Sequence, residues 1–198
     1  MTSAPTIIDA ILGRRSTAPR NLGLPGPGQE DLHSLASAVA AAPDHGRLGP
    51  LRLINIPDDK RHALADLFVE AARAADPNAS VAVLEAAGER ALAGPVLLAV
   101  IATIQDDHPD IPPHEQWICV GAALQNVLLA AEARGFAAKM VSGRRVRSPV
   151  LRSAFTLAEN EHLVGFVMLG TASADAASKP VLRRSADQVF SHWSPPGT

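Results

Sequence analysis

Pro95-Val96-Leu97-Leu98-Ala99-Val100-Ile101-Ala102 is a continuous apolar run that follows a Gly-Pro break in the chain. A strand covered on one face alternates apolar and polar residues, whereas a strand covered on both faces has no need to. The run is therefore typical of a central strand that is buried on both faces of its sheet. The other predicted elements lie before and after it.

Several helical patterns surround this run in the sequence. Apolar residues recur at helical spacing over residues 6–15, 29–42, 58–71 and 80–93, and Asp58 is the expected N-cap of the third helix. The longest pattern covers residues 114–134 and ends at Gly135, the expected C′ residue. Because its apolar residues occupy most of the helix circumference, we expect this helix to be central or shared with a second subunit.

Three further strands are predicted at residues 51–56, 136–141 and 162–170, and Ser148-Pro149 opens a short helix. Helices and strands do not follow the strict alternation of a doubly wound parallel fold. The sequence therefore predicts an α+β fold, with a small mixed sheet surrounded by helices. We expect one domain over residues 1–198, with a core at 7–171 and a C-terminal tail at 172–198.

Composition excludes several classes of function. The 198 residues are 47% hydrophobic and 19% charged, with a net charge of −2, which is typical of a globular protein and not of a dedicated nucleic-acid binder. The apolar runs are too short for a membrane span, and the N-terminus lacks the pattern of a signal peptide. With Cys119 as the single cysteine, no internal disulfide is possible. These features predict a cytoplasmic protein that binds neither membrane nor nucleic acid.

The loop at residues 105–113 holds a His/carboxylate cluster that includes Asp106, Asp107 and His108. Its spacing matches no metal-site signature, so a solvated acidic loop is favoured and no metal is expected. The chain also lacks a Gly-x-Ser-x-Gly elbow and a phosphate-binding loop, and no residue is singled out as a catalytic acid or base.

Arg14-Arg15-Ser16 forms a dense set of hydrogen-bond donors directly after the first predicted helix. Guanidinium groups bind phosphate or carboxylate oxygens through two parallel N–H groups, and a serine hydroxyl can donate to the same anion. The alternative is that both arginines only complement the negative end of the helix dipole. Both interpretations remain open from these residues alone.

Four segments in this order resemble the flavin-dependent nitroreductase family, in particular its compact NAD(P)H nitroreductase branch. They are Arg14-Arg15-Ser16, Ala42-Pro43-Asp44-His45, the stretch at residues 135–143 and the stretch at residues 163–171. The resemblance covers residues 7–171. It implies a nitroreductase-like α+β fold with a mostly antiparallel sheet, in a domain-entwined homodimer that binds FMN at the subunit interface.

The resemblance also implies roles for individual residues. Arg14, Arg15 and Ser16 would bind the FMN phosphate and ribityl chain. Ala41 and His45 would contribute from the other subunit, and residues 140–142 would lie against the flavin ring. The cofactor-binding residues implied in this way are Arg14, Arg15, Ser16, Ala41, His45, Met140, Val141 and Ser142.

The implied activity is ping-pong hydride transfer, in which NAD(P)H reduces FMN and a nitroaromatic, quinone or enone then reoxidises it. An alternative is a flavin-binding protein with little turnover, such as a flavin store, a sensor or a flavin-destroying enzyme. A third possibility is a helical dimerisation module that binds no flavin. Relatives usually carry an aromatic and a basic residue where this chain has Met140-Val141, which predicts a roomier flavin pocket. Trp117 would either partly fill that space or serve only in packing.

Overall fold

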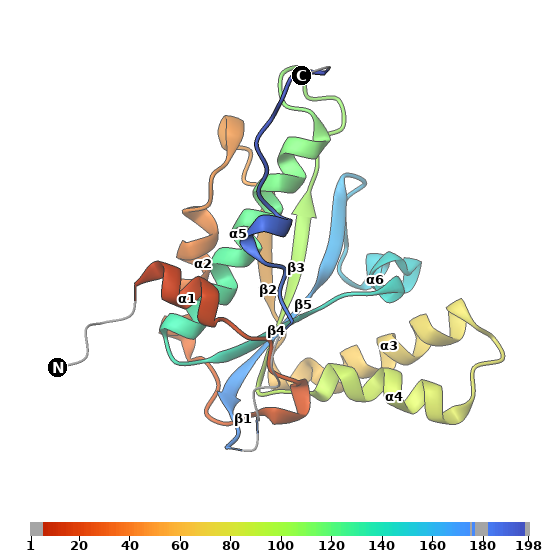
Figure 1. The fold of residues 1–198 in the computed structure, drawn as a ribbon. Helices are drawn as coiled ribbons and strands as arrows, with labels where there is room; N and C mark the ends of the chain where they lie inside the picture. Colours follow the sequence, from red (N-terminus) through yellow and green to blue (C-terminus); the bar gives the residue numbers. More distant parts are fainter. Residues whose placement is uncertain (1–5, 175, 177–181, 197–198) are drawn as a thin grey trace.

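The computed structural model describes residues 6–174, 176 and 182–196 (Figure 1). In this part of the chain, β2 (Leu51–Asn55), β3 (Val96–Thr103) and β5 (Glu161–Ala172) lie side by side. The other edge of β5 pairs with both β4 (Ala137–Val141) and the two-residue β1 (Leu22–Gly23). Each of these strand pairs is antiparallel, so the predicted α+β fold with a mostly antiparallel sheet is confirmed.

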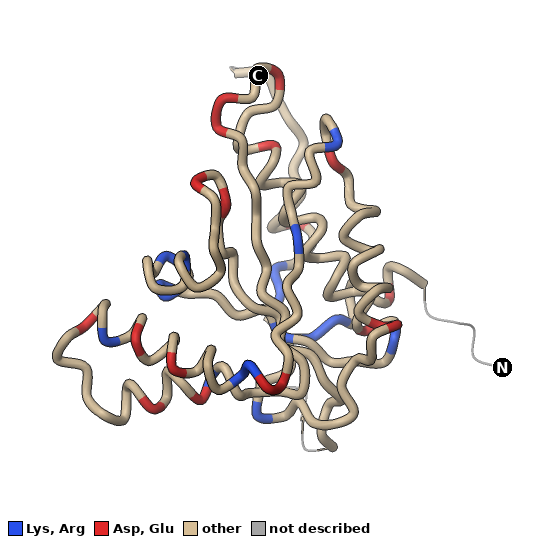
Figure 2. The backbone as a smooth tube through the Cα atoms, turned by 180° about the vertical axis from the view of Figure 1, so that it is seen from behind, with Lys and Arg blue, Asp and Glu red and all other residues tan. Residues whose placement is uncertain are grey.

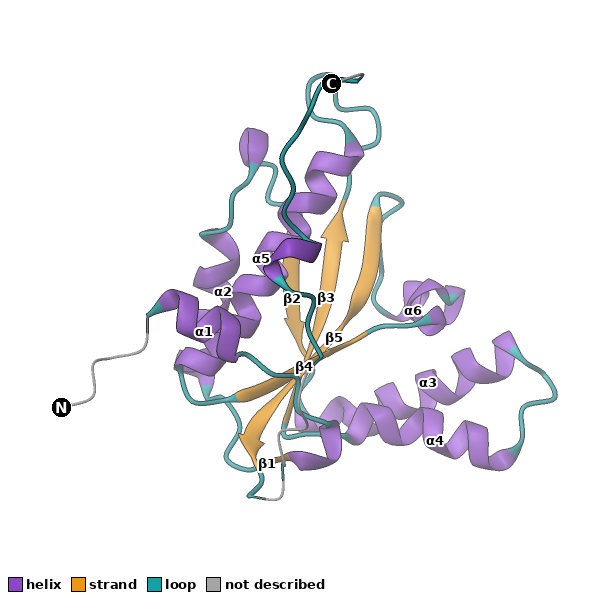
Figure 3. Ribbon diagram, in the orientation of Figure 1, coloured by secondary structure: helices purple, strands orange, loops and turns teal. Residues whose placement is uncertain are grey.

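Two groups of helices cover the two faces of this sheet (Figures 1 and 3). One face carries α2 (Gln29–Ala40) and α5 (Pro113–Ala133), with α1 (Ile7–Gly13) beside α5. The other face carries α3 (Arg61–Ala75), α4 (Val81–Leu92) and α6 (Pro149–Ala154). Helices α3 and α4 form a hairpin that extends away from the sheet (Figure 3).

Strand β3 belongs to both cores, as its unbroken apolar sequence predicts. Leu97, Ala99 and Ile101 pack in the cluster formed with α3, α4 and α6. The intervening Leu98, Val100 and Ala102 pack in the cluster formed with α2 and α5. Because successive side chains of a strand point to opposite faces, six buried residues in a row serve two cores at once.

A β-bulge interrupts β5 at Val164. Val100 of β3 pairs with Gly165, but the next residue, Ile101, pairs with Leu163, so Val164 has no partner in β3. The extra residue shifts the alternation of β5 by one position. As a result, Leu163 and Phe166 lie on the same face of the sheet although they are three residues apart.

The bulge lies directly against the end of β4. A Cβ atom at Gly165 would stand 2.4 Å from both the carbonyl oxygen of Val141 and the Cε atom of Met140. The Ser142 hydroxyl donates a 2.7 Å hydrogen bond to the carbonyl oxygen of Val164. Residues 140–142 are therefore held in place by a contact that only glycine allows at position 165.

The predicted element boundaries need two corrections. Asp58 does not cap α3: it begins the short 3-10 turn η3 (Asp58–Lys60), and the N-cap position of the helix is Lys60. Strand β1 lies within the Gly/Pro-rich stretch at residues 21–28, where no strand is predicted from the sequence, and it is only two residues long. Gly135 follows α5 with a positive φ of 82°, as expected of a C′ glycine.

The described part of the C-terminal tail lies on the surface. It contains one short 3-10 turn, η5 (Ala186–Gln188), and the Trp193 side chain is exposed. Arg183 reaches back to the N-terminal segment and donates a hydrogen bond to the carbonyl oxygen of Arg14. The division into a core at 7–171 and a tail at 172–198 stays a prediction.

Glu161, at the start of β5, joins three elements. It accepts a hydrogen bond from Nε of Arg52 in β2, on the far side of β3, and another from the backbone N–H of Ala158. Its backbone carbonyl accepts from Arg152 of α6. The hydrogen bond from Arg52 is the main reason that the pKa of Glu161 lies below its usual value.

We expect Gly165→Ala to destabilise the protein by about 1–3 kcal/mol, because the new methyl group must displace backbone atoms of β4. Urea denaturation measures the change in the free energy of unfolding. Gly23→Ala in β1 is the matched control, since the nearest atom to its Cβ would be 3.9 Å away. An equally small effect of both substitutions would contradict the close packing at the bulge.

Glu161 should also make stability depend on pH. A carboxyl group whose pKa is lowered in the folded state stabilises the fold above its unfolded-state pKa, and this contribution is lost as the pH falls through the folded-state value. Between pH 7 and pH 3, a range that extends well below the ordinary pKa of 4.5, the unmodified protein should therefore lose more stability than the Glu161→Gln variant. Urea denaturation at both pH values measures the difference, and parallel losses would show that this contact contributes little.

Candidate functional site

The N-terminal segment returns to the sheet at β4. Helix α1 ends where the backbone N–H of Arg14 donates to the carbonyl oxygen of Ala10, and the chain then becomes extended. Ser16 forms an isolated parallel bridge with Ala138, and the Thr17 N–H donates to the carbonyl oxygen of Ala138 at 3.1 Å. The fold thus places Arg14-Arg15-Ser16 beside the first half of β4.

The two neighbouring arginines have different environments. Nη1 of Arg15 lies 2.7–3.0 Å from the carbonyl oxygens of Leu12, Gly13 and Arg14, so this guanidinium caps the C-terminus of α1. Nη1 of Arg14 instead lies 3.4 Å from the Ser16 hydroxyl oxygen. Arg15 therefore caps the helix, as the dipole interpretation predicts. The side chains of Arg14 and Ser16 instead lie next to each other, so that both can donate hydrogen bonds to one anion.

Two cavities adjoin this segment on opposite sides of β4. Arg14 and Arg15 line a cavity of about 260 Å³, together with Leu128 and Glu132 near the end of α5. A larger cavity of about 820 Å³ lies between β4, β5 and the α3–α4 hairpin, and Val141 and Ser142 are among its lining residues. The Met140 side chain packs on the α5 side of the sheet and does not line the larger cavity.

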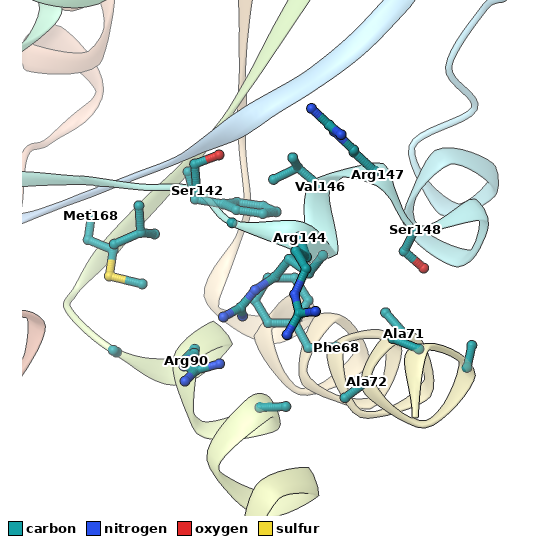
Figure 4. Close-up of a pocket in the computed structure, with 18 of the residues that line it drawn as sticks. Phe68, Ala71, Ala72, Arg90, Ser142, Arg144, Val146, Arg147, Ser148 and Met168 are labelled. Atoms are coloured by element: carbon teal, nitrogen blue, oxygen red, sulfur yellow. The ribbon is translucent and has the colours of Figure 1, made fainter. Parts of the chain in front are cut away.

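The larger cavity combines an apolar floor with a cationic rim. Phe68, Phe166 and Met168 line the floor, and alanines of α3 form one wall (Figure 4). The rim includes the 3-10 turn η4 (Arg144–Arg147), which is drawn in blue beside the hairpin in Figure 2. The cationic lining residues are Arg90, Lys139, Arg144, Arg145 and Arg147, and the described lining contains no Asp or Glu.

Arg145 is the half-buried member of this set. Its guanidinium carbon lies 4.8 Å from the centroid of the Phe68 ring, a cation–π contact. Burial is the main cause that lowers the pKa of Arg145, and the positive charge of Arg90 lowers it further. The guanidinium groups of Arg90 and Arg145 are thus close enough to repel each other across the cavity.

These arginines were missed by the sequence prediction. The signal was present, because Arg144-Arg145-Val146-Arg147 directly follows the Ser142-Gly143 pair of the third recognised segment. The position of Arg90 could not be anticipated, since it reaches the cavity from α4, more than fifty residues earlier in the chain.

His45 lies at the opposite end of α5 from Arg14, and Ala41 directly follows α2, whose Ala38 carbonyl accepts a hydrogen bond from Asn126 in the middle of α5. Nδ1 of His45 is 2.7 Å from Oε2 of Glu115, in the first turn of α5. Arg14 lines the small cavity with Glu132, in the last turn of the same helix. A helix of 21 residues is about 30 Å long, so a single chain does not bring His45 and Arg14 together.

Comparison with known proteins places this geometry in a family. The model of the nitroreductase family matches residues 11–171, which include β1 to β4 and all of β5 except its last residue. The chain belongs to the nitroreductase family. The predicted family is therefore confirmed. A relative from Escherichia coli K12, named "Putative NAD(P)H nitroreductase YdjA", is 29% identical over 171 residues, covering 86% of this chain and 91% of the relative.

Solved structures of family members share the fold. The nitroreductase-like family protein from Bacillus cereus has a TM-score of 0.80 at 21% identity, with 98% of this chain and 100% of that chain covered. A nitroreductase from Desulfovibrio desulfuricans, solved in complex with FMN, has a TM-score of 0.69 at 22% identity, covering 98% of this chain and 100% of that chain. At these identities the likeness shows the shared fold and no more.

Trp117 does not reach the large cavity of this family member. It lines a separate cavity of about 500 Å³ with His162 and Arg147, and its ring centroid is 5.6 Å from that of His162. The space beside Met140-Val141 is therefore not filled by Trp117 within one chain.

Among the described residues no helix is long and apolar enough to cross a bilayer, and no group of three His, Cys, Asp or Glu is placed to hold a metal ion.

Proposed function

We propose that this nitroreductase-family protein is an FMN-dependent oxidoreductase that uses NAD(P)H to reduce nitroaromatic, quinone or enone acceptors. The observation that carries the proposal is the placement of Arg14 and Ser16 beside β4, whose far end lines an apolar-floored cavity at Val141 and Ser142. Supporting it, the E. coli relative is named as an NAD(P)H nitroreductase and the D. desulfuricans structure contains FMN.

The residues present fit the chemical groups of FMN. A phosphate needs cationic and hydroxyl donors, which Arg14 and Ser16 offer as a converging pair. Arg15 would act mainly by fixing the end of α1, because its Nη1 is occupied by helix carbonyls. A planar ring needs apolar surface, and Val141, which lines the larger cavity at the end of β4, supplies part of it.

The chemistry that FMN supplies when bound is hydride transfer, from NAD(P)H in one half-reaction and to the acceptor in the other. The protein's part would be to orient and to exclude water. Because the Ser142 hydroxyl already donates to Val164, the backbone of residues 140–142 is held rigidly and is available to contact the ring. We assign no side chain as a catalytic acid or base.

A homodimer would complete the site. The four large apolar residues of α1, namely Ile7, Ile8, Ile11 and Leu12, are between 41% and 73% exposed. Trp117 and Ile118 of α5 are also exposed, at 40% and 67%. Exposed apolar surface on two neighbouring helices is typical of a subunit interface. If two α5 helices pack antiparallel, Ala41 and His45 of one subunit come close to Arg14 of the other.

The first experiment is a visible absorption spectrum of the protein with added FMN, repeated without oxygen after addition of NADPH or NADH. Bound flavin that is bleached by either nucleotide supports the oxidoreductase. Bound flavin that stays yellow would indicate the alternative of a flavin store, a sensor or another protein with little turnover. A protein that binds no flavin would contradict both.

Arg14→Ala should weaken FMN binding by about 1.5–3 kcal/mol, the free energy of a hydrogen bond to a charged group. Fluorescence quenching during titration with FMN measures the dissociation constant. Arg20→Ala is the matched control, because Arg20 is an exposed arginine nearby that lines none of the cavities described above. If both variants bind FMN equally well, Arg14 does not hold the phosphate.

Mixed dimers test whether each site is shared between subunits. Arg14→Ala and His45→Ala should each weaken FMN binding at both sites of their own homodimers. When the two variants are refolded together, the hybrid dimer contains one site with neither substitution, so a fraction of high-affinity binding should return. Sedimentation confirms the dimer, and the absence of any recovery would show that the two residues do not act in one shared site.

A further inference from the structure

The cationic rim of the large cavity has no counter-charge within the described chain. Arg90, Arg144 and Arg145 form no ion pair with any described carboxylate, and no described Asp or Glu lines the cavity. Arg90 and Arg144 extend from α4 and η4 toward the space between these elements, whereas Arg147 extends away from it (Figure 4). Like charges that converge without an acidic partner favour binding of an anion.

This rim is separate from the segment that we propose for the FMN phosphate. Arg14 and Ser16 lie beside Ala138, at the beginning of β4, and Arg14 lines the smaller cavity. Arg144 and Arg145 follow the end of β4 and face the α3–α4 hairpin. Val141 and Ser142, the proposed ring contacts, lie at the end of β4. They therefore come between the start of β4, where Arg14 and Ser16 lie, and the arginines of η4.

We propose that Arg90, Arg144 and Arg145 form a subsite for an anionic group on the electron acceptor, so that the preferred acceptors are aromatic acids. The subsite rests on the proposed function, because it selects the acceptor of that same site. The alanine wall of α3 and the Val146 side chain of η4 offer apolar surface for the aromatic ring. The guanidinium groups would bind its carboxylate through paired N–H groups.

The half-buried position of Arg145 supports this assignment. A guanidinium that loses water on burial is stabilised by a charged partner, and among the described residues Arg145 contacts the face of Phe68 but no carboxylate. A bound carboxylate would offset both the loss of water and the repulsion from Arg90. The cavity volume of about 820 Å³ also lies within the range of small-molecule sites.

The test compares two acceptors that carry the same nitro group, 4-nitrobenzoate and the neutral 4-nitrobenzamide. With FMN-loaded protein, kcat/KM should be higher for the acid. In Arg90→Gln and Arg144→Gln the ratio of kcat/KM for acid over amide should fall about tenfold or more, as expected for the loss of a charge-assisted hydrogen bond. Arg73→Gln removes the same charge from an exposed position of α3 that does not line the cavity, and should leave the ratio unchanged.

A binding measurement separates this proposal from the proposed function. Calorimetric titration with benzoate and with benzamide needs no turnover, and the native protein should bind benzoate at least tenfold more tightly, with the preference reduced in Arg144→Gln. Equal binding of the two ligands would overturn the subsite even if the protein is an active FMN oxidoreductase. Failure to bind FMN would overturn the proposed function while the benzoate preference could still be measured.

Two other outcomes would also overturn the subsite. If Arg90→Gln and Arg144→Gln raise the KM for NADPH but leave the ratio for the two acceptors unchanged, the arginines serve the phosphates of the electron donor. If the same substitutions weaken FMN itself, they serve the cofactor phosphate.

Discussion

The contact between the end of β4 and the bulge of β5 determines where the functional residues lie. Gly165 allows the Val141 carbonyl to approach the bulge closely, and Ser142 ties the next residue to Val164. From this fixed point the chain turns directly into η4, which carries the arginines of the large cavity. The other end of β4 receives the N-terminal segment at Ala138. One short strand thus aligns two cationic groups with the apolar surface between them.

The sequence was most informative where one physical requirement determines the pattern. Strand β3 contributes side chains to the cores on both faces of the sheet. Its unbroken apolar sequence follows from this and predicted a central buried strand. Helix α5 and its C′ glycine were predicted for similar reasons. The hydrophobic pattern could not predict β1, because a strand of two residues among glycines and prolines is too short to show a periodicity. The bulge was not predicted either, although Gly165 inside an otherwise apolar strand pattern is the residue type that marks such a position.

The site was predictable only in part, and the reason is spatial. Arg14 and Ser16 could be named as candidates from the sequence, because a local run of hydrogen-bond donors has chemical meaning by itself; their role stays a prediction. Arg90 was not, because its position depends on how the α3–α4 hairpin lies over the sheet. The predicted contribution of Ala41 and His45 has a different status. Within one chain His45 is separated from Arg14 by the length of α5, so a shared site depends on a second subunit.

The construction of α1 has a consequence for how the protein assembles. This helix has no buried residue; it is held at its N-terminus by the Thr6–Asp9 capping box and at its C-terminus by the Arg15 guanidinium. A helix of seven residues gains little stability from its own hydrogen bonds. If the proposed dimer covers its apolar face, the order of α1 in solution should therefore rise with protein concentration. Dilution would then loosen the segment that carries Arg14 before the sheet itself unfolds.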